Sequence, residues 1–234
     1  MLIMLLIYTL KKLFKSTYSL EKSTVFKLVL KIKYIIPFFL ISSSSFNNAV
    51  TEVERISFSV IKNESSIGFI DVEKSSLDKT TIYTINSEVN TRVIFNFNAV
   101  GREKSIYNED TLVFSSVYRK INKKVKLNQS LSLIEGKYFL KNKRKKEFLD
   151  IGVINNNLVT LFFIEPVYTK EVYLDKYKKM VKITPLERGK YQVILPNKSS
   201  NIYYYKNGAC AKVEVVGTFY KVKLIPNNVI ENTL

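Results

Sequence analysis

Polar and apolar side chains alternate along most of the chain after residue 53. The longest example runs from Tyr83 to Val100, where the odd positions are mostly apolar or aromatic and the even positions are polar. Shorter runs of the same kind are Arg55 to Lys62 and Lys123 to Ile134. A period of two places one face of a strand on a core and the other in water, as in antiparallel sheets. The pattern therefore predicts antiparallel strands, with Phe95 and Phe97 on the buried face.

Turn-forming residues separate the alternating runs. The strongest signal is Asn207-Gly208, which lies between Tyr203 to Tyr205 and Ala211 to Val216. Asn-Gly suits a type I′ turn because both central residues need a positive φ. We therefore expect a two-residue hairpin at this position. Polar clusters predict further breaks at residues 63–66, 75–79, 101–104 and 108–110.

One segment lacks the alternation. Asn155 to Asn157 precede the apolar stretch Leu158 to Ile164, and Glu165-Pro166 follows it. Asparagine is a favourable N-cap, and proline prevents a helix from continuing. We expect a short helix near residues 157–164 that plugs or crosses the sheet. A fully buried strand is the alternative, because the period of a short apolar run does not decide between the two.

These elements predict an all-β fold in which residues 50–234 form a single antiparallel domain. Strands recur at the spacing of about 8–12 residues that is typical of sandwiches and barrels. No internal repeat or long linker divides this part of the chain. We expect one strongly curved antiparallel sheet, either a half-barrel or a closed barrel, because curvature or closure protects the strand edges.

The first 49 residues differ from the rest, since they contain seven lysines and one glutamate. A basic stretch runs into the uncharged apolar block Tyr34 to Ile41, and small residues follow it. This order is typical of a secretory signal peptide, and the apolar block is shorter than the roughly 20 residues that cross a bilayer. We expect residues 1–49 to be a signal peptide or N-terminal export segment, with a true start downstream of Met1. The alternative is an N-terminal helix packed on the domain or an anchor that is never cleaved.

The composition excludes catalysis and metal binding that depend on histidine. The 234 residues include no histidine and a single cysteine, Cys210. Without histidine, the chain has no Ser-His-Asp or Cys-His nucleophile and no histidine-ligated metal. A lone cysteine forms neither an intrachain disulfide nor a four-thiolate zinc site, and between two alanines it is expected to be a buried packing residue. The sequence predicts no metal and no cofactor.

Two catalytic patterns that need no histidine carry little weight. Ser59 and Lys62 match Ser-x-x-Lys, but in a strand this spacing directs the two side chains to opposite faces. Two carboxylates alone can hydrolyse glycosides, but no spacing marks a pair here. We expect no enzymatic activity and keep a carboxylate-only hydrolase as an alternative. Its candidate acids are Glu109, Asp110, Glu165, Glu171 and Asp175.

The chain has a net charge of +17, and the positive charge of residues 50–234 is concentrated in one predicted hairpin. Residues 119–146 contain eleven basic side chains and one acidic residue, Glu135. Lys124 and Lys126 are expected to face water, away from Val125 and Leu127. Such a cluster attracts an anionic surface. The alternative without a partner is a solvated strand face that discourages edge pairing. Nucleic acid is the least favoured partner. The other cations in the predicted anionic-surface site are Lys141, Lys143, Arg144, Lys145 and Lys146.

The order of several short motifs resembles an uncharacterised family of exported Gram-negative bacterial proteins, known only as a domain of unknown function. These motifs are Ile67-Gly68, Glu165-Pro166, Val172-Tyr173, Gly189-Lys190-Tyr191 and Tyr203 to Gly208. The resemblance extends over about residues 53–225. The family is similar in outline to the curved half-barrels that carry lipoproteins across the periplasm. The resemblance implies a concave apolar face under a short helix, no catalysis and no defined active residues.

Together these observations predict an exported, non-catalytic protein in the periplasm or associated with the outer envelope. The first functional hypothesis is binding of an apolar or amphipathic ligand, lipid or lipoprotein-like, in the concave face. Phe95, Phe97, Leu131 and Leu133 would lie near that site, although they could equally be core. The alternative is an envelope-associated structural protein that uses the basic hairpin 119–146 against an anionic surface.

Overall fold

The computed structural model describes residues 51–92, 96–142, 145–217 and 220–227, all of which belong to the unit 49–234. The expected export segment, residues 1–49, lies outside the described residues, and its role stays a prediction. Within the described ranges, no helix is both long and apolar enough to cross a membrane.

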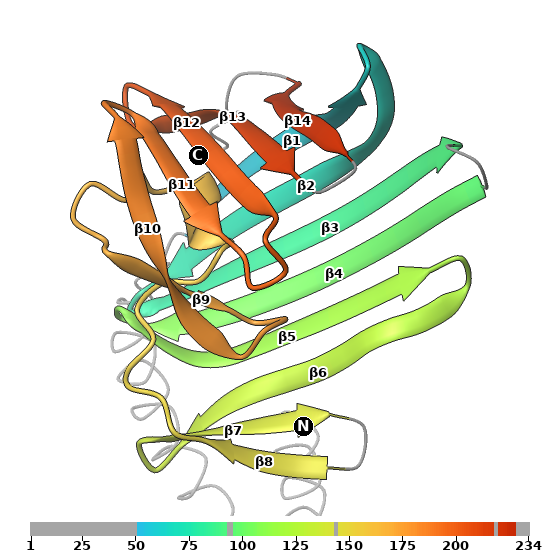
Figure 1. Ribbon diagram of the computed structural model, residues 1–234. Coiled ribbons are helices and arrows are strands. Elements are labelled where there is room, and N and C mark those ends of the chain that lie inside the picture. The colour runs from blue at the N-terminus through green and yellow to red at the C-terminus, as the bar shows by residue number, and fades with distance from the viewer. Residues whose placement is uncertain (1–50, 93–95, 143–144, 218–219, 228–234) are drawn as a thin grey trace, which may run out of the picture. The chain divides into compact units, whose positions relative to one another are not determined.

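The described residues form fourteen antiparallel strands and one 3₁₀ helix (Figure 1). The strands are β1 (Glu52–Lys62), β2 (Ser65–Leu77), β3 (Thr80–Arg92), β4 (Asn96–Asn108), β5 (Thr111–Ile121), β6 (Lys124–Ile134), β7 (Lys137–Asn142), β8 (Lys145–Leu149), β9 (Glu171–Leu174), β10 (Lys179–Glu187), β11 (Lys190–Ile194), β12 (Ser200–Lys206), β13 (Ala209–Val216) and β14 (Lys221–Pro226). The helix is η1 (Thr160–Phe162).

The strands make one open sheet with a simple connectivity. Each strand pairs with its neighbours in the chain, β1 also pairs with β14, and the only consecutive strands that do not pair are β8 and β9. These two strands are therefore the edges of the sheet. An ion pair of 3.2 Å between Lys178, after β9, and Glu147 on β8 links the two ends. The predicted all-β fold with one strongly curved antiparallel sheet is confirmed, and the sheet is open.

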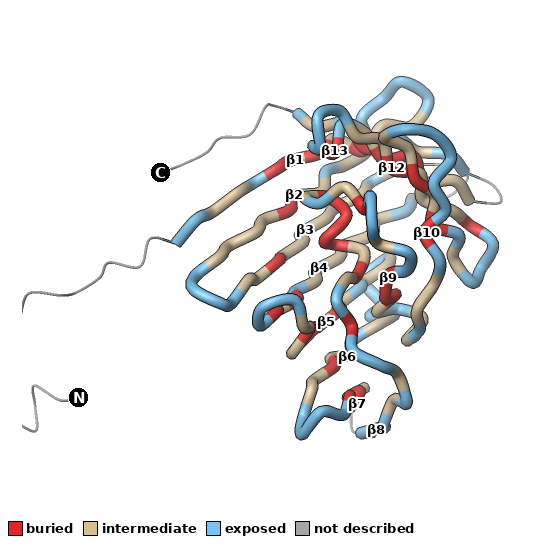
Figure 2. The backbone as a smooth tube through the Cα atoms, turned by 90° about the vertical axis from the view of Figure 1, so that its left-hand side faces the viewer, coloured by how far each residue is buried: buried red, intermediate tan, exposed pale blue. Residues whose placement is uncertain are grey.

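The alternation of faces is visible in a row of residues that are directly opposite one another across β3 to β7. Each member is buried, and opposite residues in antiparallel strands share a face of the sheet. This row therefore marks the inner, concave face, as the periodicity predicts for Tyr83 and Leu131. In Figure 2 the buried residues lie on strands of both halves of the sheet. The row consists of Tyr83, Ser105, Ser115, Leu131 and Leu140.

The turn predictions are confirmed with one exception. Asn207 and Gly208 have φ values of 52° and 80° and join β12 to β13 as a two-residue turn. Turns also occur at the expected breaks 63–66, 75–79 and 108–110. The predicted break at 101–104 is wrong, because these residues lie inside β4. Their polar side chains alternate between the concave face, where Glu103 points into a cavity, and the outer face.

Two strand predictions also need correction. The run from Tyr83 to Val100 is not one strand, since β3 ends at Arg92 and β4 begins at Asn96. In β6, a bulge shifts the pairing so that Arg119 is opposite Leu127 and Lys120 is opposite Val125. The expected alternation is lost there, and Val125 is 55% exposed alongside exposed Lys124 and Lys126.

The segment between β8 and β9 crosses the inside of the curve and contains η1. The short helix expected near residues 157–164 is confirmed, but it is a single 3₁₀ turn that starts after Val159 without a side-chain cap. The expected asparagine N-cap is therefore wrong, and the Asn157 amide instead donates to Ser105 Oγ at 2.8 Å. Leu161 and Phe162 pack into a core with β1, β2 and β9 to β14. Ile154 and Val159 complete a second core against β3 to β7.

Candidate functional site

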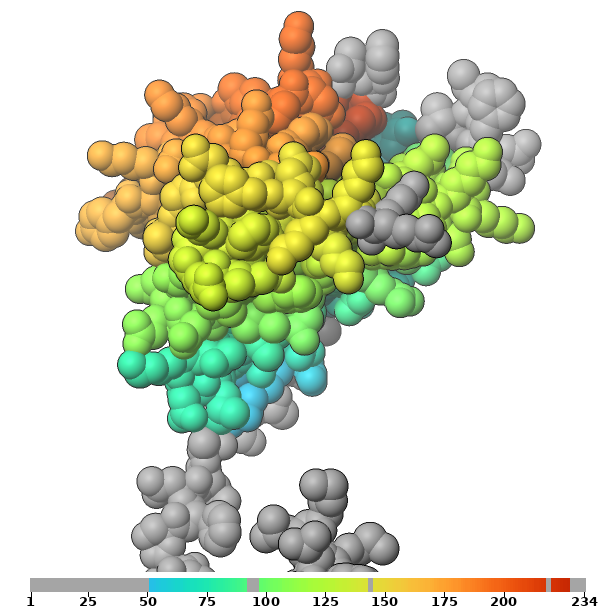
Figure 3. Space-filling model, turned by 90° about the horizontal axis from the view of Figure 1, so that it is seen from below, coloured from blue at the N-terminus to red at the C-terminus, as the bar shows by residue number. Residues whose placement is uncertain are grey.

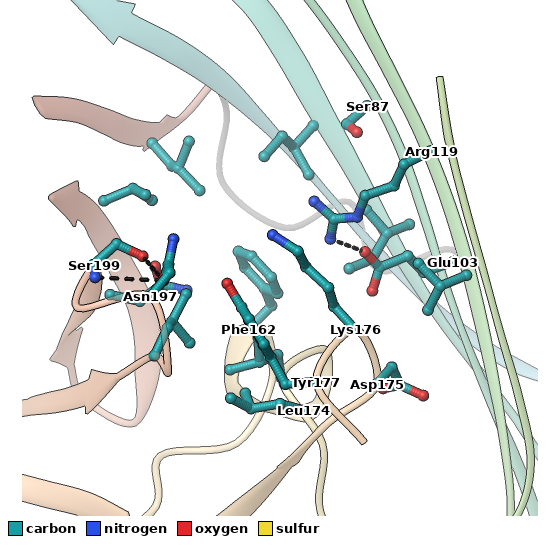
Figure 4. Close-up of a pocket in the computed structure, with 18 of the residues that line it drawn as sticks. Ser87, Glu103, Arg119, Phe162, Leu174, Asp175, Lys176, Tyr177, Asn197 and Ser199 are labelled. Carbon is teal, nitrogen blue, oxygen red and sulfur yellow. Dashed lines mark hydrogen bonds and ion pairs between the residues drawn. The ribbon is translucent and has the colours of Figure 1, made fainter. Parts of the chain in front are cut away.

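A cavity of about 280 Å³ lies on the concave side of the sheet. One wall comes from the inner faces of β2 to β5, and the opposite side comes from η1, the turn after β9 and strands β12 to β14 (Figure 4). Most of the lining residues are at inward positions of strands, so the cavity follows from the curvature of the sheet. The volume is just below the roughly 300–1,000 Å³ of ligand pockets.

Apolar side chains form one part of the lining. They come from residues far apart in the chain, because the curved sheet brings β2 and β3 opposite β13 and β14. Phe162 of η1 lies among them, and its ring is 5.3 Å from that of Phe58 and 6.1 Å from that of Tyr203. The apolar lining consists of Ile70, Ile85, Val117, Leu158, Phe162, Leu174, Leu195, Val215 and Leu224.

Charged groups form another part of the lining. Arg119 on β5 and Glu103 on β4 make an ion pair of 2.5 Å at the wall of the cavity (Figure 4). Lys176 extends into the cavity from the turn after β9, and its ammonium lies 4.8 Å from the centre of the Tyr177 ring. Among the described residues, Lys176 makes no ion pair with a carboxylate. The cavity thus presents an available cation beside an apolar wall.

A buried polar network lies next to Lys176. The Asp175 carboxylate accepts hydrogen bonds from Ser115 Oγ at 2.5 Å and from Asn157 Nδ2 at 3.1 Å. The Asp175 backbone oxygen accepts a third from Gln129 Nε2 at 2.6 Å. Burial raises the pKa of the Asp175 carboxyl from 3.8 to about 6, although the hydrogen bond from Ser115 opposes this shift. Both carboxylate oxygens are occupied by the protein, so Asp175 orders the turn that carries Lys176.

Three polar atoms close to this network have no hydrogen-bond partner among the described residues. They are the Tyr107 hydroxyl, the Tyr173 hydroxyl and Asn157 Oδ1, and all three are buried. Burial raises the pKa of both tyrosines, and the nearby Asp175 raises it further. Buried polar atoms without partners are uncommon in folded proteins. This part of the concave face therefore has unused hydrogen-bonding capacity.

Those residues expected to bind a ligand that the structure describes, Phe97, Leu131 and Leu133, lie outside this cavity lining. Leu131 is 2% exposed in the second core, and Leu133 packs against that core. Phe97 is eight residues before the buried Ser105 and therefore on the same, inward side of β4. It is nevertheless 37% exposed, because it lies near the start of the strand. Phe95 lies outside the described residues. Ligand binding at these four positions stays a prediction.

The cations expected to contact an anionic surface are exposed where the structure describes them. Lys124, Lys126, Lys141, Lys145 and Lys146 are all exposed. Lys143 and Arg144 lie outside the described residues. Nothing in the structure tests the proposed partner, and the described ranges contain no group of three acidic or thiol side chains arranged to hold a metal ion.

Sequence reasoning missed the residues that line the cavity. In the sequence, Glu103 falls in a predicted break, Arg119 is one of eleven hairpin cations, and Lys176 has no distinguishing neighbour. Asp175 is one of five candidate acids. The side chains of Ser115 and Asp175 come from positions 60 residues apart, so no local pattern could have paired them.

Comparison with known proteins identifies the family. The chain matches the family described as domain of unknown function DUF6134 over residues 58–227. It is also similar to the crystal structure of a β-barrel-like protein of domain of unknown function DUF1849 from Brucella abortus, with 10% identity and a TM-score of 0.45, over 79% of this chain and 98% of that one. No curated protein matches the chain. Since the first match extends over more than half of the chain, this protein belongs to the DUF6134 family.

Proposed function

We propose that the domain binds a single-chain amphipathic molecule with an anionic head group in the cavity of the concave face. The observation that carries this proposal is the position of Lys176, which extends into a cavity of about 280 Å³ that also has an apolar wall. An apolar chain would lie against Ile70, Ile85 and Val117. Its head group would accept hydrogen bonds from Lys176 and from the neighbouring Arg119.

Two favourable contributions to the binding free energy would act together. Burial of apolar surface contributes about 25 cal/mol per Å², and a charge-assisted hydrogen bond to a lysine adds roughly 1.5–3 kcal/mol. Arg119 is already paired with Glu103, so Lys176 is the cation that supplies most of the anion selectivity. The proposed role is binding and carriage of the ligand, without a catalytic step.

The proposal includes an exported location, in the periplasm or at the outer envelope. Its support is the basic and apolar pattern of residues 1–49, which is typical of a signal peptide. N-terminal sequencing of the mature protein tests this part separately. A mature chain that begins at Met1 would contradict it without affecting the cavity proposal.

Calorimetric titration of the full chain with laurate tests the cavity proposal, with dodecanol as the uncharged control. We expect laurate to bind more tightly than dodecanol, and Lys176→Gln to weaken laurate binding by roughly tenfold or more while leaving dodecanol unchanged. Lys179→Gln is the matched control, because Lys179 is exposed in the same hairpin and does not line the cavity. Equal binding of laurate by wild type and Lys176→Gln, or no binding at all, would refute the proposal.

A further inference from the structure

The outer face of β4 to β8 carries a row of cations and hydroxyls. The members are directly opposite one another in successive strands, so they share one face of the sheet. Lys104, the first member of the row, directly precedes the buried Ser105 in β4. Successive strand residues point to opposite faces, so the row lies on the convex side. The three lysines of the row are exposed. The row consists of Lys104, Ser116, Ser130, Lys141 and Lys146.

A second row on the same face is mostly apolar and lies beside the first. Phe148, at the edge of the sheet, is 50% exposed, and its ring centre lies 5.9 Å from that of Phe139. The Lys146 ammonium lies 4.4 Å from the centre of the Phe139 ring, so the two rows are in direct contact. This row consists of Ile106, Phe114, Ser132, Phe139 and Phe148.

The outer face of these strands has one sign of charge. Among the described residues of β4 to β8, no acidic side chain occupies an outward strand position. Glu103 and Glu147 lie on the inward side, where they pair with Arg119 and Lys178. Arg102 adds a further exposed cation to the outer side. Figure 3 shows β7 and β8 at the surface when the domain is seen from below.

We propose that the convex face of β4 to β8 docks on a bilayer rich in anionic phospholipid. Lysines beside exposed aromatic rings are typical of surfaces that lie at the membrane interface, where the cations meet the head groups and the rings enter the boundary below them. A solvated edge accounts for lysines but leaves an exposed Phe148 unexplained. Of these strands, β4 and β5 line the concave cavity, and they do so with their inward side chains Glu103, Val117 and Arg119, so docking of the convex face would leave the cavity available.

Vesicle flotation of the full chain tests the charge requirement, with phosphatidylglycerol mixed into phosphatidylcholine and with phosphatidylcholine alone. The test variant carries Lys104→Gln, Lys141→Gln and Lys146→Gln. We expect a weaker partition into the anionic vesicles by roughly fivefold for each lysine, on the order of a hundredfold in total. A control with Lys182→Gln, Lys206→Gln and Lys223→Gln has the same net charge from exposed positions on β10, β12 and β14. Residues 1–49 are the same in both variants and contribute equally to their binding. Equal losses in the two variants would therefore overturn the proposal.

A tryptophan reporter tests which face makes contact. The chain has no tryptophan, so Phe148→Trp introduces a single tryptophan in the aromatic row, and its emission can be excited selectively over that of the tyrosines. We expect its emission to shift to the blue on addition of anionic vesicles, whereas Leu186→Trp, at a 46% exposed position on β10, should not shift. Emission that is already blue-shifted without vesicles would mean that another part of the chain covers this face. That result, or tight binding to DNA without binding to vesicles, would overturn the membrane proposal.

Discussion

The Ser115 hydroxyl donates a hydrogen bond of 2.5 Å to Asp175 Oδ1 and thereby joins β5 to the turn that follows β9. Asn157, from the segment that crosses the inside of the sheet, donates to the other carboxylate oxygen. A single carboxyl group thus joins side chains from β5 and the crossing segment to the turn after β9. It also holds the turn from which Lys176 enters the cavity.

The first prediction concerns the pH dependence of stability through Asp175. Burial raises its pKa from 3.8 to about 6, so the folded state binds this proton more tightly than the unfolded state does. The stabilisation is complete below about pH 4 and is lost as the pH rises through about 6. We expect the free energy of unfolding of wild type, relative to that of Asp175→Asn, to increase by at most about 3 kcal/mol from pH 7 to pH 4. Urea unfolding at several pH values measures this difference.

Ser115→Ala provides an independent variant for the same carboxyl group. Because the hydrogen bond from Ser115 lowers the Asp175 pKa, its loss should raise that pKa and extend the pH window upward. It should also cost about 1–3 kcal/mol at neutral pH, where the carboxylate loses a buried donor. Identical pH slopes for wild type, Asp175→Asn and Ser115→Ala would contradict the assignment.

The second prediction concerns the role of η1 as part of the core. Phe162 is 7% exposed and contacts the rings of Phe58 and Tyr203. We expect Phe162→Ala to lower the free energy of unfolding by about 3–5 kcal/mol, because the crossing segment fills the inside of the curve. Phe148→Ala, at an exposed position, should cost less than about 1 kcal/mol. Similar losses in the two variants, measured by urea unfolding, would show that η1 is not a core element.

The third prediction concerns the turn between β10 and β11. Gly189 has a φ of 72°, and a Cβ atom at this position would lie 2.8 Å from the Tyr205 backbone oxygen. We expect Gly189→Ala to lower the melting temperature and to cost about 1–3 kcal/mol. Gly152→Ala is the matched control, since its added Cβ would meet no atom within 4 Å in the rest of the described chain beyond its two neighbours, and its effect should stay within about 0.5 kcal/mol. The opposite ranking would contradict the register of β11 and β12.

The fourth prediction concerns the single thiol. Cys210 is 5% exposed, and burial raises its pKa to about 12. Since the thiolate is the reactive form, we expect the folded protein to react with Ellman's reagent at least about a hundredfold more slowly than the urea-unfolded protein. Ser66→Cys in a Cys210→Ala background places a thiol at an exposed position near the start of β2 and should react rapidly in the folded state. Fast reaction of native wild type would mean that the β12–β13 end opens readily.

The sequence alone predicts the features that depend on neighbouring residues. Alternation identifies the buried face of Tyr83 and Leu131, and the Asn207-Gly208 pair identifies its hairpin, because each signal arises from backbone geometry within a few residues. The apolar stretch before Pro166 likewise predicts a crossing segment, although it does not predict a helix of only three residues.

Tertiary structure alone decides the openness of the sheet and the composition of the cavity. Alternation reports which face a residue occupies and not which distant residue lies opposite it, so Glu103 and Lys176 give no signal in the sequence. The bulge in β6 directs Val125 to the opposite face from the one that its local alternation predicts. The sequence does not show this, because the bulge arises from the pairing of β6 with β5. The proximity of Ser115 to Asp175 has the same origin, since it exists only when the whole sheet bends and brings its two ends together.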